Sequence, residues 1–191
     1  MKKNPLAAFA ALLAGMNLPN KLTLLRIALV PVYLMLLWFP AFSWLALIVF
    51  AGASLTDMLD GRIARERGLI TNFGKFMDPI ADKLLTHTAF IMLCAMGRLN
   101  VVACIIFIAR EFVVSGLRLV AVEQGHVIAA GMSGKVKTVL QMALVMALTA
   151  RLDRIGLLRL PVALLTLATV VMTLYSMAEY VWQNRAVLGG E

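Results

Sequence analysis

The sequence predicts an all-α protein built as an integral membrane bundle, and three observations lead to that prediction. Of the 191 residues, 62% are hydrophobic and only 15% are charged, whereas about a quarter of the residues in a soluble domain are charged. The mean hydropathy is +0.90. The apolar residues form runs of a length that can cross a bilayer as a helix. A chain of this size cannot bury so much apolar surface in its own core, so we expect it to lie in lipid.

The first element expected is a short helix at the membrane surface, within an N-terminal segment of residues 1–18. Its two lysines and short apolar run resemble a signal peptide, but the run is too short to span. We expect an interfacial helix from Pro5 to Gly15, followed by a turn at the "NLPN" sequence.

Six transmembrane helices are expected in the remaining domain, residues 19–191. Their predicted ranges are 22–39, 42–65, 79–96, 101–122, 136–150 and 160–182. The connections between them are short, which favours an antiparallel helical bundle.

The distribution of lysine and arginine predicts that both termini face the cytoplasm. Twelve of these eighteen residues fall on one side of the predicted bundle and four on the other, and cytoplasmic loops carry the excess of positive charge. The fifth connection departs from the rule, because it carries Arg151, Arg154 and Arg159 on the side away from the cytoplasm. We expect a multi-pass protein of the bacterial cytoplasmic membrane.

The net charge of +8 does not indicate nucleic acid as a partner. The sequence has no basic stripe interleaved with aromatic residues. In a membrane protein, basic residues hold loops in the cytoplasm and favour anionic lipids. The lipid bilayer is the expected partner.

Four aspartates in one stretch of this apolar chain are the main candidates for chemistry. Asp57 and Asp60 are three residues apart, and Asp78 and Asp82 are four apart, so on helices each pair shares a face. The residues between the pairs, "RGLITNFGK" (67–75), predict a turn. The resulting hairpin would bring the two pairs opposite each other near the cytoplasmic edge of the membrane.

Four close carboxylates cannot all stay ionised without a counter-charge. Either some are protonated or cations lie between them, and oxygen ligands favour Mg²⁺, Mn²⁺ or Ca²⁺. Two Mg²⁺ ions, with Mn²⁺ as the alternative, would suit displacement at phosphorus. Acids at a helix end that are merely solvated are the structural alternative.

Residues next to the acids fit a bulky phosphate ligand. Gly61 and Ala64 leave space for a ligand to approach the helix backbone, and Arg65 can bind a phosphate through two hydrogen bonds. Gly74 precedes Asp78 by four residues, on the side that faces the acids.

A second polar group lies in the fourth predicted helix, where "AREFVVSGLRLVA" places Arg110, Glu111 and Arg118 in an apolar segment. Charges inside a membrane helix are costly and usually mark function. With Lys135 and Lys137 at the start of the next helix, these arginines indicate an anionic substrate such as a phosphate ester. Alternatively, Arg110 pairs with Glu111 to fix packing, and the lysines only set the topology.

The stretch from Asp57 to Asp82 resembles the signature of the CDP-alcohol phosphotransferase family. It reads D-x2-D-G-x2-A-R-x8-G-x3-D-x3-D and meets every fixed position: Asp57, Asp60, Gly61, Ala64, Arg65, Gly74, Asp78 and Asp82. Members of this family are six-helix membrane enzymes that join a CDP-linked donor to an alcohol and release CMP.

The resemblance implies a role for each residue of the signature. Asp57, Asp60 and Asp78 would bind the metal pair, with Asp82 touching it and acting as general base on the acceptor hydroxyl. The cytidine diphosphate of the donor would be bordered by Asp57, Gly61, Ala64, Arg65 and Gly74.

Three further stretches, "NLPNKLTLLRIALVP", "MDPIADKLL" and "REFVVSGLRLVA", resemble family members that use CDP-diacylglycerol as donor and glycerol 3-phosphate as acceptor. This likeness covers residues 17–182. It implies a homodimer in which Arg110, Arg118 and Lys135 hold the glycerol phosphate, and we add Lys137 as a candidate. Residues 1–16 lie outside the likeness.

Other functions are consistent with parts of the pattern. A cation or proton carrier also places acids and arginines in the membrane, but it needs polar groups through the whole membrane depth. A membrane prenyltransferase would show two separate aspartate-rich motifs and more helices. Within the family, an inositol-phosphate or cardiolipin-type acceptor shares the same signature.

Overall fold

The fold is all-helical in the part of the chain that the structure describes, as the sequence predicts. The computed structural model describes residues 16–66, 72–126, 128–129 and 131–189, and no β-strand occurs among them. The expected interfacial helix from Pro5 to Gly15 lies outside these residues. The chain divides between Thr88 and Ala89 into two compact units, which we describe separately.

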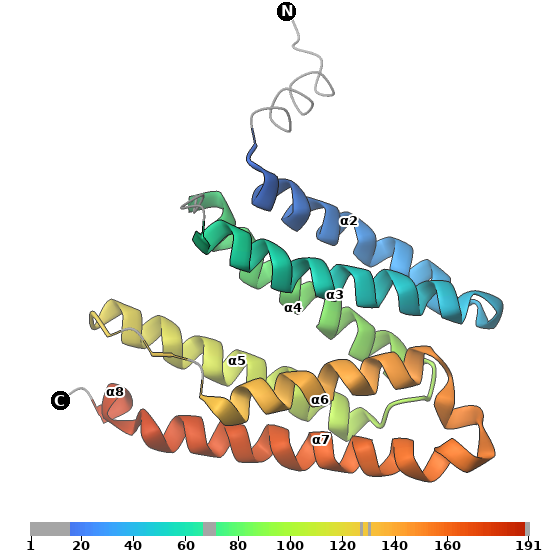
Figure 1. The fold of residues 1–191 in the computed structure, drawn as a ribbon. Helices are drawn as coiled ribbons and strands as arrows, with labels where there is room; N and C mark the ends of the chain where they lie inside the picture. Colours follow the sequence, from blue (N-terminus) through green and yellow to red (C-terminus); the bar gives the residue numbers. More distant parts are fainter. Residues whose placement is uncertain (1–15, 67–71, 127, 130, 190–191) are drawn as a thin grey trace, which may run out of the picture. The chain divides into compact units, whose positions relative to one another are not determined.

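The first unit is formed by α2, η1, α3 and the first part of α4. Their bounds are Leu18–Trp38, Pro40–Phe42, Ser43–Glu66 and Asn72–Ala95. The side chain of Asn17 caps α2 by accepting a hydrogen bond from the backbone N–H of Asn20 at 3.4 Å. α2 and α3 lie side by side (Figure 1). The rings of Tyr33 and Phe50, both fully buried, pack between them with centroids 5.4 Å apart.

The second unit is formed by the end of α4 together with α5, α6, η2, α7 and α8. Their bounds are Val101–Glu123, Met132–Thr149, Leu152–Arg154, Gly156–Gln183 and Arg185–Gly189. α7 contacts α5, α6 and η2, and it runs alongside α6 (Figure 1). The ring of Phe90 at the end of α4 packs on that of Phe107 in α5, with centroids 4.9 Å apart.

One face of α7 carries small polar residues into the unit. Thr169, Thr173, Ser176 and Tyr180 are buried at helical spacing. The hydroxyls of Thr169 and Thr173 donate to backbone carbonyls of the same helix at 2.7 Å. Small hydroxyl residues let membrane helices approach closely without an unsatisfied polar group, so this stripe is where the neighbouring helices pack.

The helices overlap the predicted segments, but four of them begin earlier than predicted. α2, α6 and α7 each begin four residues earlier, at Leu18, Met132 and Gly156, and the largest difference is at α4. The sequence predicts a turn over residues 67–75 and a spanning segment from Pro79, but α4 begins at Asn72. Residues 72–75 are therefore helical. The apolar residues Phe73, Phe76 and Ile80 continue the helical period, which outweighs the cost of about 1 kcal/mol for Gly74 in a helix.

Two helices of the described part are long and apolar enough to cross a membrane. They are Asn20–Trp38 and Gly156–Gln183. Large apolar side chains are exposed on both, including Met35 and Leu160, each 67% exposed. An exposed apolar surface of this kind is typical of a lipid-facing helix.

Two helices end in glycines whose backbone conformation other residues rarely adopt. Gly97 follows α4 with φ of 68° and Gly125 follows α5 with φ of 77°. After Gly97, the N–H of Arg98 donates to the carbonyl of Leu93 at 2.9 Å, and that of Gly97 donates to Cys94 at 2.9 Å. These bonds satisfy carbonyls that the helix end leaves open.

We expect Gly97→Ala to destabilise the protein through backbone strain alone. A Cβ at this position has no atom within 4 Å, so only the positive φ opposes it, at a cost of about 1–2 kcal/mol. Thermal unfolding of the detergent-solubilised protein should show a midpoint lower by a few degrees. Gly156→Ala is the control, since Gly156 has equal space and no positive φ. Equal midpoints for the two variants would contradict this explanation.

Candidate functional site

The four aspartates lie on two helices of the first unit. α3 carries Asp57 and Asp60, and α4 carries Asp78 and Asp82. Because both segments are helical, the spacings of three and four residues put each pair on one face of its helix. The side chains of these aspartates lie outside the described part of the structure, as do those of Ala64 and Arg65 and the surroundings of Gly61 and Gly74.

The arrangement of the four carboxylates therefore stays a prediction. Among the side chains that the structure describes, no group of three or more His, Cys, Asp or Glu residues could hold a metal ion. The donor set itself, four carboxylates in two helical pairs, has the chemistry that hard divalent cations prefer.

The second unit contains a buried charge cluster formed by Arg110, Glu111 and Lys137. One carboxylate oxygen of Glu111 accepts a hydrogen bond from Arg110 Nη1 at 2.9 Å and another from Lys137 Nζ. The Arg110 and Lys137 side chains are only 9% and 4% exposed. Two buried cations need a counter-charge, and Glu111 supplies it from the same helix as Arg110.

This Glu111 cluster decides between two interpretations of Lys137. A lysine that only sets membrane topology would be solvated, whereas Lys137 is buried and ion-paired. The expected pair between Arg110 and Glu111 is present. This ion pair does not occupy every donor of the Arg110 guanidinium, since the buried Nε has no hydrogen-bond partner in the described structure. A buried donor without a partner is costly, so an acceptor atom placed beside this Nε would be stabilised.

Arg118 lies two turns after Arg110 on α5 and contacts α7. Its Nε donates to the hydroxyl of Tyr180 at 3.1 Å, and its guanidinium lies 5.6 Å from the centre of that ring. Arg118 is exposed. Tyr180 thus fixes the orientation of a cation that solvent and ligands can reach.

A small hollow marks where these residues converge. It encloses about 20 Å³, room for one water molecule. Its lining includes Arg110 and Arg118 of α5, Glu179 and Tyr180 of α7, and Ser133 and Gly134 at the start of α6. Of the predicted acceptor residues, the structure thus brings Arg110 and Arg118 to one hollow. Lys137 joins them through Glu111, while Lys135 is exposed and does not line the hollow.

Gly134 controls how closely Arg110 approaches α6. A Cβ at this position would lie 3.3 Å from Arg110 Nη2, tighter than ordinary van der Waals contact. Sequence reasoning missed Gly134 and Tyr180. The "SGK" sequence at the start of α6 was a usable signal for Gly134, because a glycine in the first turn of a helix next to a cation allows close approach.

Known proteins similar to this chain point to a single family. The family model described as CDP-alcohol phosphatidyltransferase matches residues 16–180. A protein of Bacillus subtilis (strain 168), named "CDP-diacylglycerol--glycerol-3-phosphate 3-phosphatidyltransferase", is 42% identical over 184 residues, which cover 88% of this chain and 95% of the relative.

Two further relatives agree. A "Probable phosphatidylglycerophosphate synthase" of Mycobacterium tuberculosis (strain ATCC 25618 / H37Rv) is 36% identical over 91% of this chain and 84% of the relative. A protein of Pectobacterium atrosepticum with the same name as the Bacillus relative is 36% identical over 86% of this chain and 92% of its own length. The family model covers the stretch from Asp57 to Asp82 and also α5 and α6, which carry the predicted acceptor residues. The chain belongs to the CDP-alcohol phosphatidyltransferase family.

Proposed function

We propose that the protein transfers the phosphatidyl group of CDP-diacylglycerol to glycerol 3-phosphate, giving phosphatidylglycerol phosphate and CMP. Membership of the family supports the donor chemistry, and the names of the relatives support both substrates. The observation that carries the choice of a phosphorylated acceptor is the Glu111 cluster, which lies beside Arg118 in the second unit.

In this proposal the four aspartates hold two divalent cations, Mg²⁺ or alternatively Mn²⁺. The donor set fits, because both acid pairs lie within helices and supply only oxygen ligands. Bound there, such ions would stabilise negative charge on the diphosphate as its bond to CMP breaks.

The other residues of the signature bind the donor and move a proton. Asp82 takes the proton from the 1-hydroxyl of glycerol 3-phosphate. The hydroxyl oxygen then bonds to the phosphorus that carries diacylglycerol, and CMP leaves with the electrons of the broken bond. Gly61, Ala64 and Gly74 leave space for the nucleotide, and Arg65 binds the diphosphate together with Asp57 and the metal pair.

The acceptor phosphate is held by cations of the second unit. Arg110 contributes its unpartnered Nε, and Arg118 contributes guanidinium N–H groups that do not bond to Tyr180. Lys135 supplies an exposed ammonium, while Lys137 shares Glu111 with Arg110 and keeps the pair in place. Hydrogen bonds between guanidinium and phosphate are the strong, charge-assisted kind.

The location follows from the same proposal. Six of the helices, α2 to α7, would cross the cytoplasmic membrane, with both termini and the acid pairs on the cytoplasmic side, where the basic residues concentrate. The acyl chains of the donor then stay in lipid while glycerol 3-phosphate arrives from water. The proposed assembly is a homodimer.

We expect Asp82→Asn to abolish most turnover while the donor still binds. Loss of a general base costs about 10²–10⁴-fold in rate, whereas the contacts to the nucleotide remain. The measurement is CMP release from CDP-diacylglycerol with glycerol 3-phosphate, alongside binding of CDP-diacylglycerol to the purified variant.

Glu123→Gln is the control for that variant, since Glu123 is an exposed acid at the end of α5. It should keep wild-type rates. Full activity of Asp82→Asn would remove Asp82 from the mechanism.

We expect Gly134→Ala to weaken acceptor binding without loss of stability. The new methyl group would displace the Arg110 guanidinium by a few tenths of an ångström, while alanine is the better helix former. The KM for glycerol 3-phosphate should rise about tenfold, corresponding to about 1.4 kcal/mol, and the thermal midpoint should not fall.

The matched control is Gly116→Ala, a helical position on α5 where a Cβ has no atom within 4 Å. Its KM should stay at the wild-type value. If the two variants have the same KM, the position of Arg110 does not control acceptor binding.

A further inference from the structure

The charged residues at the other end of the second unit are not used by the proposed reaction. This end contains the C-terminal end of α4, the η2 turn and the start of α7. It includes all four arginines predicted to lie away from the cytoplasm: Arg98, Arg151, Arg154 and Arg159. Arg159 precedes Tyr180 by 21 residues on α7, so the two are roughly 30 Å apart along the helix. That distance matches the hydrocarbon thickness of a bilayer.

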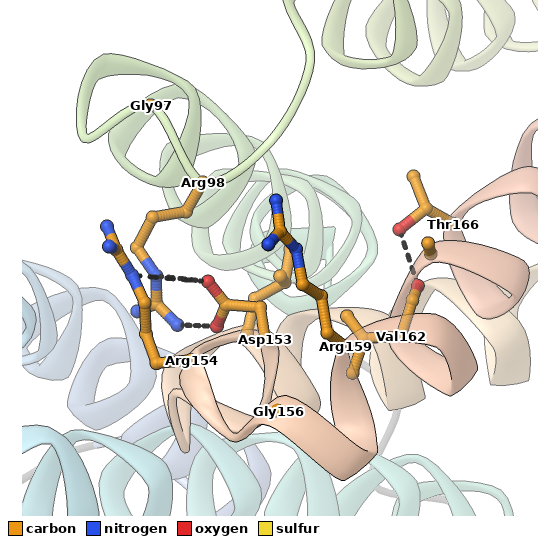
Figure 2. Close-up of a pocket in the computed structure, with 10 residues that line it drawn as sticks. Gly97, Arg98, Asp153, Arg154, Gly156, Arg159, Val162 and Thr166 are labelled. Atoms are coloured by element: carbon orange, nitrogen blue, oxygen red, sulfur yellow. Dashed lines mark hydrogen bonds and ion pairs between the residues drawn. The ribbon is translucent and has the colours of Figure 1, made fainter.

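A cavity of about 600 Å³ lies at this end (Figure 2). Arg98, Arg154 and Arg159 line it with Asp153, Thr166 and apolar side chains of α7. We call it the Asp153 cavity. It contains three cationic side chains and one anionic side chain, so its lining carries a net positive charge.

Asp153 does not neutralise this lining. Both of its carboxylate oxygens are bound by Arg98, through Nη2 to Oδ1 and through Nε to Oδ2 at 3.3 Å (Figure 2). Arg154 lies farther away, with its Nε 3.7 Å from Oδ2. No hydrogen bond or ion pair joins Arg159 to another side chain of the described structure, and Arg159 is exposed. Asp153 therefore binds Arg98 through both oxygens and Arg154 only at longer range, and it is the single carboxylate among three arginines in the cavity lining.

Two features of the cavity favour an additional anion. The Arg98 side chain is only 1% exposed, and its Nη1 is a buried donor with no partner in the described structure. Such a donor is costly unless a ligand satisfies it. Arg159 also lies in the first turn of α7, which contains no acidic residue. A cation is unfavourable at the positive end of a helix dipole, and an anion is favourable.

A separate face of α7, about a third of a turn round the helix from the residues that line the cavity, indicates what carries the anion. Leu157, Leu160, Leu164 and Leu167 follow at helical spacing and are between 56% and 87% exposed. They continue from the arginines along the helix. Arginines at a helix end with an apolar face beyond them match a phosphate group joined to acyl chains.

We propose that the Asp153 cavity binds the phosphate headgroup of an anionic phospholipid at the membrane face opposite the Glu111 cluster. The phosphate is held by Arg154, Arg159 and Nη1 of Arg98, and the acyl chains lie along the exposed leucines of α7. This site does not depend on the transfer reaction, because none of its residues belongs to the proposed catalytic machinery.

The test compares the full-length wild-type protein with the double variant Arg154→Gln/Arg159→Gln in detergent micelles. Phosphatidylglycerol is added at about 100 times its dissociation constant, and thermal unfolding is followed. We expect the wild-type midpoint to rise by about 5–10 °C and the double variant to lose at least half of that rise. Phosphatidylcholine, which has no net charge, should give a smaller rise that the variant retains.

One control and one replacement variant keep the result specific. Arg185→Gln removes an exposed arginine that stacks on Trp182 at the other end of the unit, and it should keep the whole rise. If the double variant does not fold, Arg159→Gln replaces it, since Arg159 has no partner to lose among the described side chains.

Three results would overturn the proposal. The first is a double variant that keeps the whole phosphatidylglycerol effect. The second is a rise in thermal midpoint with phosphatidylcholine that equals the rise with phosphatidylglycerol and that the two substitutions also reduce. The third is an equal rise with millimolar inorganic phosphate, which would make the ligand a free anion instead of a lipid. None of these results bears on CMP release, so the proposed function is tested separately.

Discussion

A charge inside an apolar helical bundle needs a counter-charge, and the second unit is organised by this constraint. Two carboxylates meet it: Glu111 binds Arg110 and Lys137, and Asp153 binds Arg98. Removing one partner of such a pair leaves an uncompensated buried charge, which costs about 3–5 kcal/mol. Each carboxylate thus fixes the helices on which its partners lie. Glu111 joins α5 to the first turns of α6, and Asp153 joins η2 to the residue that follows the α4 cap.

The same two charge clusters contain hydrogen-bond donors that an anionic ligand could satisfy. Neither carboxylate satisfies every donor beside it: Arg110 Nε and Arg98 Nη1 are both buried without partners in the described structure. Donors of this kind are costly in the free protein and are satisfied when an anion binds. The proposed acceptor phosphate and the proposed lipid phosphate would each complete one of the two clusters. α7 connects them, with Tyr180 near one end and Arg159 near the other.

Much of this arrangement could be predicted from the sequence because it depends on local patterns. Apolar runs located the long helices, and the signature from Asp57 to Asp82 identified the family. The start of α4 was predicted too late, because the glycine and asparagine near residue 72 suggested a turn while the apolar period already continued through Phe73. Whether Lys137 was a topology signal or a buried partner depended on a contact across 26 residues, and no local pattern encodes that. Tyr180 was missed for the same reason, since its contact with Arg118 exists only once α5 and α7 are packed. Gly134 did have a local signal in the "SGK" sequence, but its close approach to Arg110 appears only in the folded structure.

The central claim is that aspartates which bind divalent cations catalyse transfer to a phosphorylated acceptor, and that arginine and lysine side chains bind that acceptor. Its most direct test is CMP release from CDP-diacylglycerol by the purified protein, with Mg²⁺ or with EDTA. The acceptors to compare are glycerol 3-phosphate, inositol phosphate, serine and phosphatidylglycerol. We expect release to require Mg²⁺ and to be fastest with glycerol 3-phosphate. Release that persists in EDTA, or that occurs only with serine, which carries no phosphate, would contradict the account.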